Sequence, residues 1–223
     1  MSTSVSIHLP FATLSPWQQI AFAAALIERM LPNYQLFSTA ADFGDAKVLR
    51  NQLDLIWQWL ANSTGKENVL KINIEAQLAK LELQTPDPDI FDFFGAYCAL
   101  DACMALTALW QIMLNLQPKK LTRKVPPQEA DVEDIQSISL LSYSSVNAYI
   151  ELQLTDGYSE SEQIDLAVIA QEISQHALME WEIAMQNELF NFLKFAAENQ
   201  RSCQLAKEMM LAEGLSNLGL DIC

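Results

Sequence analysis

Few residues in this chain could carry out metal chemistry, and its two histidines come first. His8 lies in the N-terminal tail and His176 in the C-terminal part. Glu172, His176 and Glu180 are spaced four residues apart, so a continuous helix would present them on one face as weak candidate metal ligands. A solvated polar stripe explains the same spacing. We therefore predict no metal centre and no cofactor.

Motifs for nucleophilic or phosphate chemistry are absent from the sequence. It has no nucleophile elbow, phosphate loop or glycine-rich dinucleotide motif, and only six glycines with which to build one. The four cysteines form no CxxC pair and have no metal-ligand spacing. This pattern favours a non-enzymatic protein with reduced thiols, which is typical of the cytoplasm.

One carboxylate lies inside a long apolar segment. The segment 91–116 contains only two charges, and Asp101 is surrounded by residues that cannot neutralise it. A buried carboxylate must find a cation or hydrogen-bond donors on another helix, or be protonated. Arg29 and Arg50 are the cations we expect. Asp101 then either ties helices together or serves as the acid of a ligand pocket with Glu28 and Arg29.

A second group of candidates combines charge with aromatic side chains. Arg50 and Asp54 are four residues apart, which predicts a surface ion pair on one helix. Trp57 flanks this pair and could make it a binding edge. If Trp57, Trp59 and Tyr34 are exposed, they would form a contact patch.

Helix start and stop signals divide the N-terminal half. Ser15, Pro16 and Gln18 form a capping box, which predicts a helix that ends at Pro32. Further helices are expected over 33–41, 45–60 and 73–83, separated by turn residues. The segment 91–116 is predicted to be the buried central helix, with four buried residues: Leu100, Met104, Leu106 and Leu109.

The C-terminal half is less clearly punctuated. Residues 117–130, rich in proline and lysine, are expected to form a linker between two helical halves. Residues 135–154 favour a helix, although serine and β-branched residues leave a strand as the alternative. Residues 161–213 contain no glycine or proline and predict one to three helices. The chain 1–223 is thus predicted to be one all-α domain, a bundle of seven to nine helices.

Charge and hydropathy limit the partners. A net charge of −15 opposes sequence-independent nucleic-acid binding, which depends on neutralising phosphates with lysine and arginine. The apolar segment is long enough to span a membrane, but Asp101 would lie in the middle of the span with no second span to pair with. We therefore expect neither nucleic-acid binding nor a membrane span.

Several segments resemble a known family. SPWQQIAFAAALIERMLPNY, FGD followed by LDLIW, FDFFGAYCALDAC and EGLSNLGL are similar to the bacterial YjaG family, a family of unknown function. The resemblance covers most of the chain and weakens across 119–175. It implies a soluble, mainly helical bacterial protein and carries no catalytic residue.

Two functions stay open. The first is an interaction protein that binds another protein or a second copy of itself. The second is a small-molecule-binding or hydrolytic protein with a pocket around Asp101. A concave pocket lined by charges would favour the second, and a flat aromatic patch would favour the first.

Overall fold

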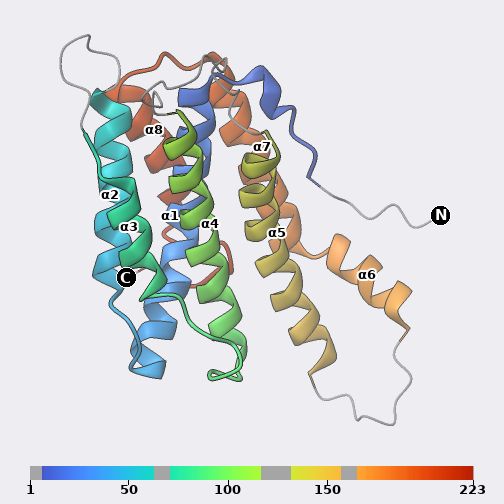
Figure 1. The fold of residues 1–223 in the computed structure, drawn as a ribbon. Coiled ribbons are helices and arrows are strands. Elements are labelled where there is room, and N and C mark those ends of the chain that lie inside the picture. The colour runs from blue at the N-terminus through green and yellow to red at the C-terminus, as the bar shows by residue number, and fades with distance from the viewer. Residues whose placement is uncertain (1–6, 63–70, 117–131, 157–164, 223) are drawn as a thin grey trace.

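The structure is a computed structural model, and it describes residues 7–62, 71–116, 132–156 and 165–222. These residues form a helical bundle, with a short 3-10 helix at Phe11–Thr13 and no strand (Figure 1). The α-helices are α1 (Pro16–Ala41), α2 (Ala46–Asn62), α3 (Ile74–Glu82), α4 (Phe94–Leu116), α5 (Val132–Thr155), α6 (Leu166–Ser174), α7 (Ala177–Phe195) and α8 (Gln200–Leu211). The predicted all-α class with seven to nine helices is confirmed. The linker predicted at 117–130 lies wholly outside the described residues.

α1 lies at the centre of the bundle and contacts α2, α4, α5, α7 and α8. It begins with the predicted capping box: the Ser15 hydroxyl accepts from the Gln18 N–H at 3.2 Å, and the Gln18 side chain accepts from the Ser15 N–H at 2.8 Å. All residues from Ile20 to Ile27 are fully buried. Four of these eight are alanines, which let neighbouring helices approach closely.

The prediction that the first helix ends at Pro32 is wrong, because α1 continues to Ala41. Proline has no N–H, so the Glu28 carbonyl loses its helical donor, and an interior proline costs about 3 kcal/mol. The turn after the proline is nevertheless anchored, since Tyr34 and Phe37 are buried. Packing of this turn against the core outweighs the local preference.

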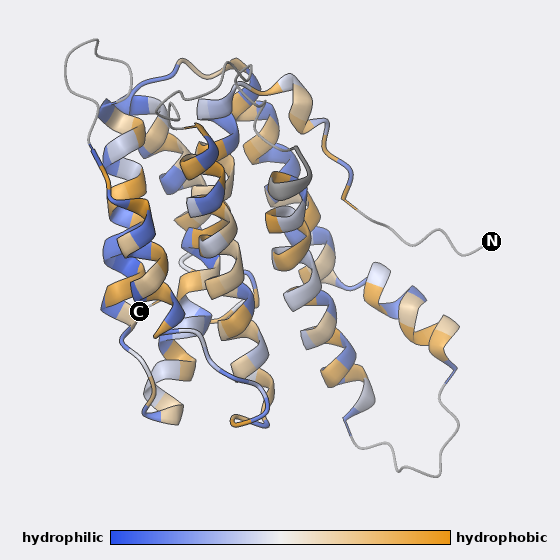
Figure 2. Ribbon diagram, in the orientation of Figure 1, coloured by the Kyte–Doolittle hydropathy of each residue, from blue (hydrophilic) through white to orange (hydrophobic). Residues whose placement is uncertain are grey.

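α4 packs against α1 and lies between α3 and α5. Leu106 and Leu109 are fully buried, as predicted. Leu100 is only half-buried, and the prediction for Met104 is wrong, since 47% of its surface is exposed. α4 therefore contributes one side to the core and turns another side to solvent. Hydrophobic residues predominate along the whole helix (Figure 2), so sequence pattern alone could not tell the two sides apart.

The outward side of α4 carries a row of apolar residues. Phe93, immediately before the helix, and Tyr97 and Met104 within it are 42%, 48% and 47% exposed. With the half-buried Leu100 they recur at intervals of four, three and four residues, which places Tyr97, Leu100 and Met104 on one helix face. Phe93 precedes the helix, and its ring packs 5.7 Å from that of Phe37. We call these four residues the α4 stripe.

α4 is the one helix of the described residues that is long and apolar enough, by length and composition, to cross a membrane. Just over half of that span is buried inside the bundle. This is the arrangement of a core helix in a soluble protein.

The C-terminal half resolves the ambiguities of the sequence. Residues 132–155 form a helix, α5, rather than a strand. The described part of the stretch predicted as one to three helices, from residue 165 on, contains three, and the breaks fall where His176 and Asn199 cap α7 and α8. A smaller second core packs α4, α5, α6 and α7 against the C-terminal segment. Its buried members are Cys98, Val146, Ile150, Ile169, Ile173, Met179 and Leu218.

Candidate functional site

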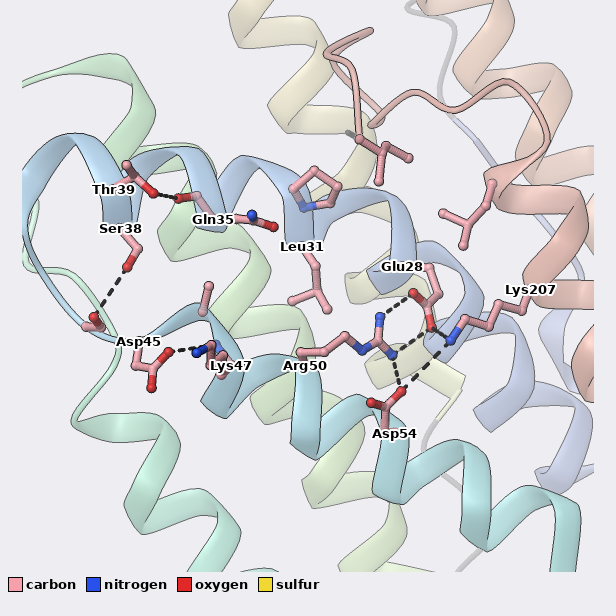
Figure 3. A pocket seen from close by; sticks show the side chains of 15 residues that line it. Glu28, Leu31, Gln35, Ser38, Thr39, Asp45, Lys47, Arg50, Asp54 and Lys207 are labelled. Atoms are coloured by element: carbon pink, nitrogen blue, oxygen red, sulfur yellow. Dashed lines mark hydrogen bonds and ion pairs between the residues drawn. The ribbon is translucent and has the colours of Figure 1, made fainter.

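A cleft of about 650 Å³ opens between the C-terminal half of α1, the first turns of α2, the end of α8 and the C-terminal segment (Figure 3). Its charged wall comes from all three helices. The charged residues that line it are Glu28, Asp45, Lys47, Arg50, Asp54 and Lys207. The cleft therefore gathers three of the chain's thirteen lysines and arginines.

Glu28 is the buried anchor of this charged wall, with only 2% of its side chain exposed. Its Oε2 accepts from Arg50 Nη1 at 2.5 Å, and its Oε1 accepts from Arg50 Nη2 at 2.9 Å. Oε1 also accepts from Trp57 Nε1 at 2.7 Å and lies 3.2 Å from the Lys207 ammonium. Both oxygens are engaged, so Glu28 holds two cations in place and is not free to act as a general base.

Arg50 links the buried Glu28 to Asp54, which is partly exposed at the surface. Its Nη2 also donates to Asp54 at 2.8 Å, which confirms the predicted ion pair between residues four apart. Burial lowers the pKa of Arg50, but hydrogen bonds and charges from Glu28, and then from Asp54, raise it overall. Lys207 lies 3.9 Å from Asp54 and closes the group on the α8 side. Four charged groups from three helices thus balance one another.

The predicted aromatic contact patch is wrong. Trp57 is 8% exposed and is fixed to Glu28, and Tyr34 is fully buried. The Tyr34 hydroxyl donates to the Gln84 carbonyl at 2.8 Å, and burial raises its pKa. Trp59 is half-buried and packs against the core. These rings face inward because α2 and the end of α1 bury their apolar sides against the bundle.

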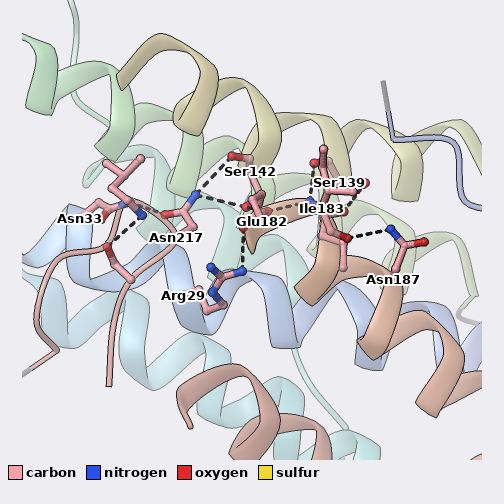
Figure 4. Close-up of polar contacts among 11 residues, drawn as sticks. Arg29, Asn33, Ser139, Ser142, Glu182, Ile183, Asn187 and Asn217 are labelled. Carbon is pink, nitrogen blue, oxygen red and sulfur yellow. Dashed lines mark hydrogen bonds and ion pairs between the residues drawn. The ribbon is translucent and has the colours of Figure 1, made fainter. Parts of the chain in front are cut away.

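A second polar centre is buried inside the bundle (Figure 4). Arg29 Nη1 donates to Glu182 Oε2 at 2.6 Å, and both side chains are completely buried. The Arg29 guanidinium also lies over the Trp181 ring, 4.1 Å from its centre. This ion pair joins α1 to α7.

Neutral groups complete the second centre. Glu182 Oε1 accepts from Ser142 at 2.7 Å and from Gln186 at 2.7 Å. Asn217 of the C-terminal segment donates to the Ser142 hydroxyl at 3.2 Å and accepts from Asn33 at 2.7 Å. The centre therefore holds four parts of the fold together: α1, α5, α7 and the C-terminal segment.

Asp101 is contacted by neither arginine, so the expected pairing with Arg29 or Arg50 is wrong. Its Oδ2 accepts from the Ser145 hydroxyl of α5 at 2.5 Å. The side chain is half-buried and does not line the cleft. The prediction failed because each arginine is bound by a glutamate outside α4. Glu28 of α1 binds Arg50, and Glu182 of α7 binds Arg29.

Replacing Asp101 with asparagine is expected to stabilise the protein at neutral pH. Burial raises the pKa of Asp101, and the Ser145 hydrogen bond only partly offsets this. A carboxyl whose pKa is raised by folding favours the fold in acid, and that contribution is lost as the pH rises through the folded-state pKa. Thermal melts should show Asp101→Asn above wild type at neutral pH and level with it in acid. The exposed Asp92→Asn is the control, and a lower melting temperature for Asp101→Asn at neutral pH would contradict the assignment.

The predicted face of Glu172, His176 and Glu180 does not form, because the helix breaks between them. Glu172 lies on α6 and Glu180 on α7. His176 Nδ1 accepts from the Leu178 N–H at 3.2 Å as the cap of α7. The described residues contain no group of three or more side chains placed to hold a metal ion.

The cleft also contains a residue that sequence reasoning missed. Lys207 comes from α8, more than 150 positions beyond Arg50 and Asp54, and no local pattern links it to them. The geometry brings together Glu28, Arg50, Asp54 and Trp57 of the sequence candidates. Arg29, Tyr34 and Asp101 lie elsewhere.

The fold and the cleft define a single-domain all-helical bundle with a charge-lined cavity. Residues 6–221 match the family described as "Protein of unknown function (DUF416)", and the chain belongs to that family. It is 32% identical over 217 residues to the uncharacterized protein YjaG of Escherichia coli K12, covering 96% of this chain and 95% of that protein. An uncharacterized protein of Haemophilus influenzae is 30% identical, with 96% of each chain covered.

A solved structure supports the fold. The crystal structure of a DUF416 family protein from Shewanella baltica OS155 aligns with a TM-score of 0.76 at 32% identity, covering 96% of this chain and 100% of that one. The expected resemblance to the YjaG family is therefore confirmed. The family is one of unknown function, so function must be argued from the surface of this chain.

Proposed function

We propose that the protein is a non-enzymatic, cytoplasmic protein that acts through protein–protein contacts, and that its α4 stripe binds a second copy of the chain. The observation that carries the proposal is the exposure of Phe93, Tyr97 and Met104 on one face of an otherwise core-forming helix. Contiguous exposed apolar side chains mark contact surfaces. Tyrosine, phenylalanine and methionine are also enriched at such surfaces.

The spacing of the α4 stripe supports helix-on-helix packing. Its intervals of four, three and four residues are those of a coiled-coil seam, in which each side chain inserts between residues of the facing helix. A two-fold contact places the same surface on both sides, so a seam of this kind complements itself. The arrangement needs no partner with a different pattern.

Charge favours a second copy as the occupant. A protein of net charge −15 repels its own copies over most of its surface. Asp101 is the single charged residue in α4, and Ser145 binds it. The part of the stripe within α4, from Tyr97 to Met104, is therefore a place where two copies can meet with little repulsion, although the exposed Asp92 precedes Phe93. A basic partner would instead seek the acidic surface.

The contact should be weak. Four side chains on about 17 Å of helix cover less than the roughly 800 Å² per partner of a standard interface. We expect a dimer with a dissociation constant on the order of 10 μM, which forms and separates with concentration.

The cytoplasmic assignment is supported by the thiols. Cys98, Cys103 and Cys203 are buried and unbridged. Burial raises the pKa of Cys98 to about 12 and that of Cys203 to about 11, which keeps both protonated and inert. Buried free thiols are typical of proteins in reducing compartments.

Sedimentation velocity over a range of protein concentrations tests the proposal. The wild type is expected to shift from monomer to dimer as concentration rises. Tyr97→Glu and Met104→Glu should each stay monomeric, because a dimer would bury a carboxylate without a partner. Leu166→Glu, at a 74% exposed position on α6, adds the same charge away from the stripe and should behave as wild type.

Two outcomes would contradict self-association through the stripe. One is a wild type that stays monomeric at every concentration. The other is equal loss of the dimer in Leu166→Glu, which would attribute the effect to net charge alone.

A further inference from the structure

The cleft between α1, α2 and α8 has the size of a small-molecule site. Its volume of about 650 Å³ lies within the usual range of roughly 300–1,000 Å³ for such sites. No residue of the α4 stripe lines it. An inference about the cleft therefore stands independently of the proposed dimer.

The charged wall has cationic donors to spare. Arg50 Nε is buried and has no hydrogen-bond partner, although the other two guanidinium nitrogens are bound. Lys47 is exposed and forms no ion pair among the described residues. Lys207 has three N–H groups, and its ammonium forms ion pairs with Glu28 at 3.2 Å and with Asp54 at 3.9 Å. A ligand that accepts hydrogen bonds would satisfy the N–H groups of Lys47 and Lys207, whereas Arg50 Nε has almost no accessible surface and would not contact it.

The charge balance disfavours a ligand with more than one negative charge. The cationic Lys47, Arg50 and Lys207 are matched by three acids that line the same cavity, Glu28, Asp45 and Asp54. A multiply charged phosphate would meet Asp54 and Asp45 in a protein that is already strongly acidic. A carboxylate adds one charge, and its two oxygens suit arginine and lysine donors.

The rest of the wall is apolar. Leu31 and Pro32 of α1, Leu211 of α8 and Ile222 of the C-terminal segment line the cavity alongside the charges. A ligand that fits has a short hydrocarbon body against these side chains and its charged end toward the cations. Burial of each methylene contributes about 0.8 kcal/mol.

We infer that the cleft binds a small organic monocarboxylate with a short apolar body, held by Lys47, Arg50 and Lys207. Glu28 is the positioning residue, because its buried carboxylate binds both the Arg50 guanidinium and the Lys207 ammonium and holds them in place. Trp57 Nε1 donates to the Glu28 carboxylate and so fixes the Glu28 side chain.

Ligand-observed NMR titrations with three simple probes test this inference. Hexanoate supplies both the charge and the hydrocarbon, hexanol supplies the hydrocarbon alone, and inorganic phosphate supplies a higher charge without hydrocarbon. Hexanoate is expected to bind at least about tenfold more tightly than either of the other two. Equal binding of hexanol, tighter binding of phosphate, or no binding of hexanoate would overturn the inference.

Paired variants locate the binding. Lys47→Gln combined with Lys207→Gln should weaken hexanoate binding by about tenfold or more, because it removes two charged donors and leaves Arg50 on Glu28. Lys80→Gln combined with Lys194→Gln changes the net charge equally at two exposed positions outside the cleft, on α3 and α7. This control should bind as wild type. Equal affinities in the two double variants would overturn the inference, and thermal melts verify that both are folded.

The two proposals can fail separately. The cleft variants leave the α4 stripe intact, so their sedimentation should match that of the wild type. Tyr97→Glu and Met104→Glu leave the cleft intact and should bind hexanoate normally.

Discussion

Glu182→Ala is expected to lower the free energy of unfolding by about 3–5 kcal/mol, the usual cost of breaking a buried ion pair from one side. The change leaves the fully buried Arg29 guanidinium without a carboxylate. It also removes the acceptor of Ser142 and Gln186. Urea denaturation followed by circular dichroism measures the effect.

Matched variants separate the charge from the packing. Glu180→Ala removes an exposed glutamate from the same helix and should change stability by less than about 0.5 kcal/mol. The double variant Arg29→Met with Glu182→Leu replaces both charges by apolar groups and should recover much of the loss. A Glu182→Ala protein as stable as wild type would show that the pair does not hold α1 to α7.

Gly44→Ala is expected to cost about 2–5 kcal/mol, from backbone strain together with a steric clash. Gly44 has φ +70°, in the left-handed region that favours glycine. A Cβ there would lie within van der Waals overlap of the Tyr34 hydroxyl, which is fixed to the Gln84 carbonyl. The turn between α1 and α2 is therefore closed around this glycine.

Gly214 provides the control for this prediction. Its φ of +66° is similar, but a Cβ there would meet no atom within 4 Å. Gly214→Ala should therefore cost only the strain, about 1–2 kcal/mol. Adding Tyr34→Phe to Gly44→Ala removes the clashing oxygen, so the two changes should cost less together than their sum. Equal losses for the two glycine variants, measured by urea denaturation, would contradict the clash.

The order of helices could be predicted from the sequence because most of the signals are local. Ser15 caps the helix that follows it, as predicted, and the helix expected over 73–83 begins directly after its cap Asn73. The prediction that Pro32 ends the first helix was wrong for a physical reason. Burial of Tyr34 and Phe37 outweighs the helix-breaking preference of proline, and that burial depends on helices distant in sequence. The break at His176 was missed because a histidine cap has no strong sequence signature.

The candidate site was only half predictable. The Arg50–Asp54 pair follows from helical spacing, whereas its links to Glu28 and Lys207 depend on how α1, α2 and α8 pack. Asp101 was correctly singled out as a carboxyl in an apolar helix, but its partner proved to be a neutral serine. Sequence patterns give the spacing within a helix, and contacts between helices need the fold.

The central claim is that the α4 stripe contacts a second copy of the same chain. Photo-crosslinking in living cells tests it most directly, with a benzophenone-bearing amino acid in place of Met104 and, as a control, in place of the exposed Phe195 of α7. The account predicts a product of twice the chain mass from position 104, in which the crosslinked peptide comes from α4. Products that join position 104 only to lipid or to a different protein, or equal dimer yields from positions 104 and 195, would contradict it.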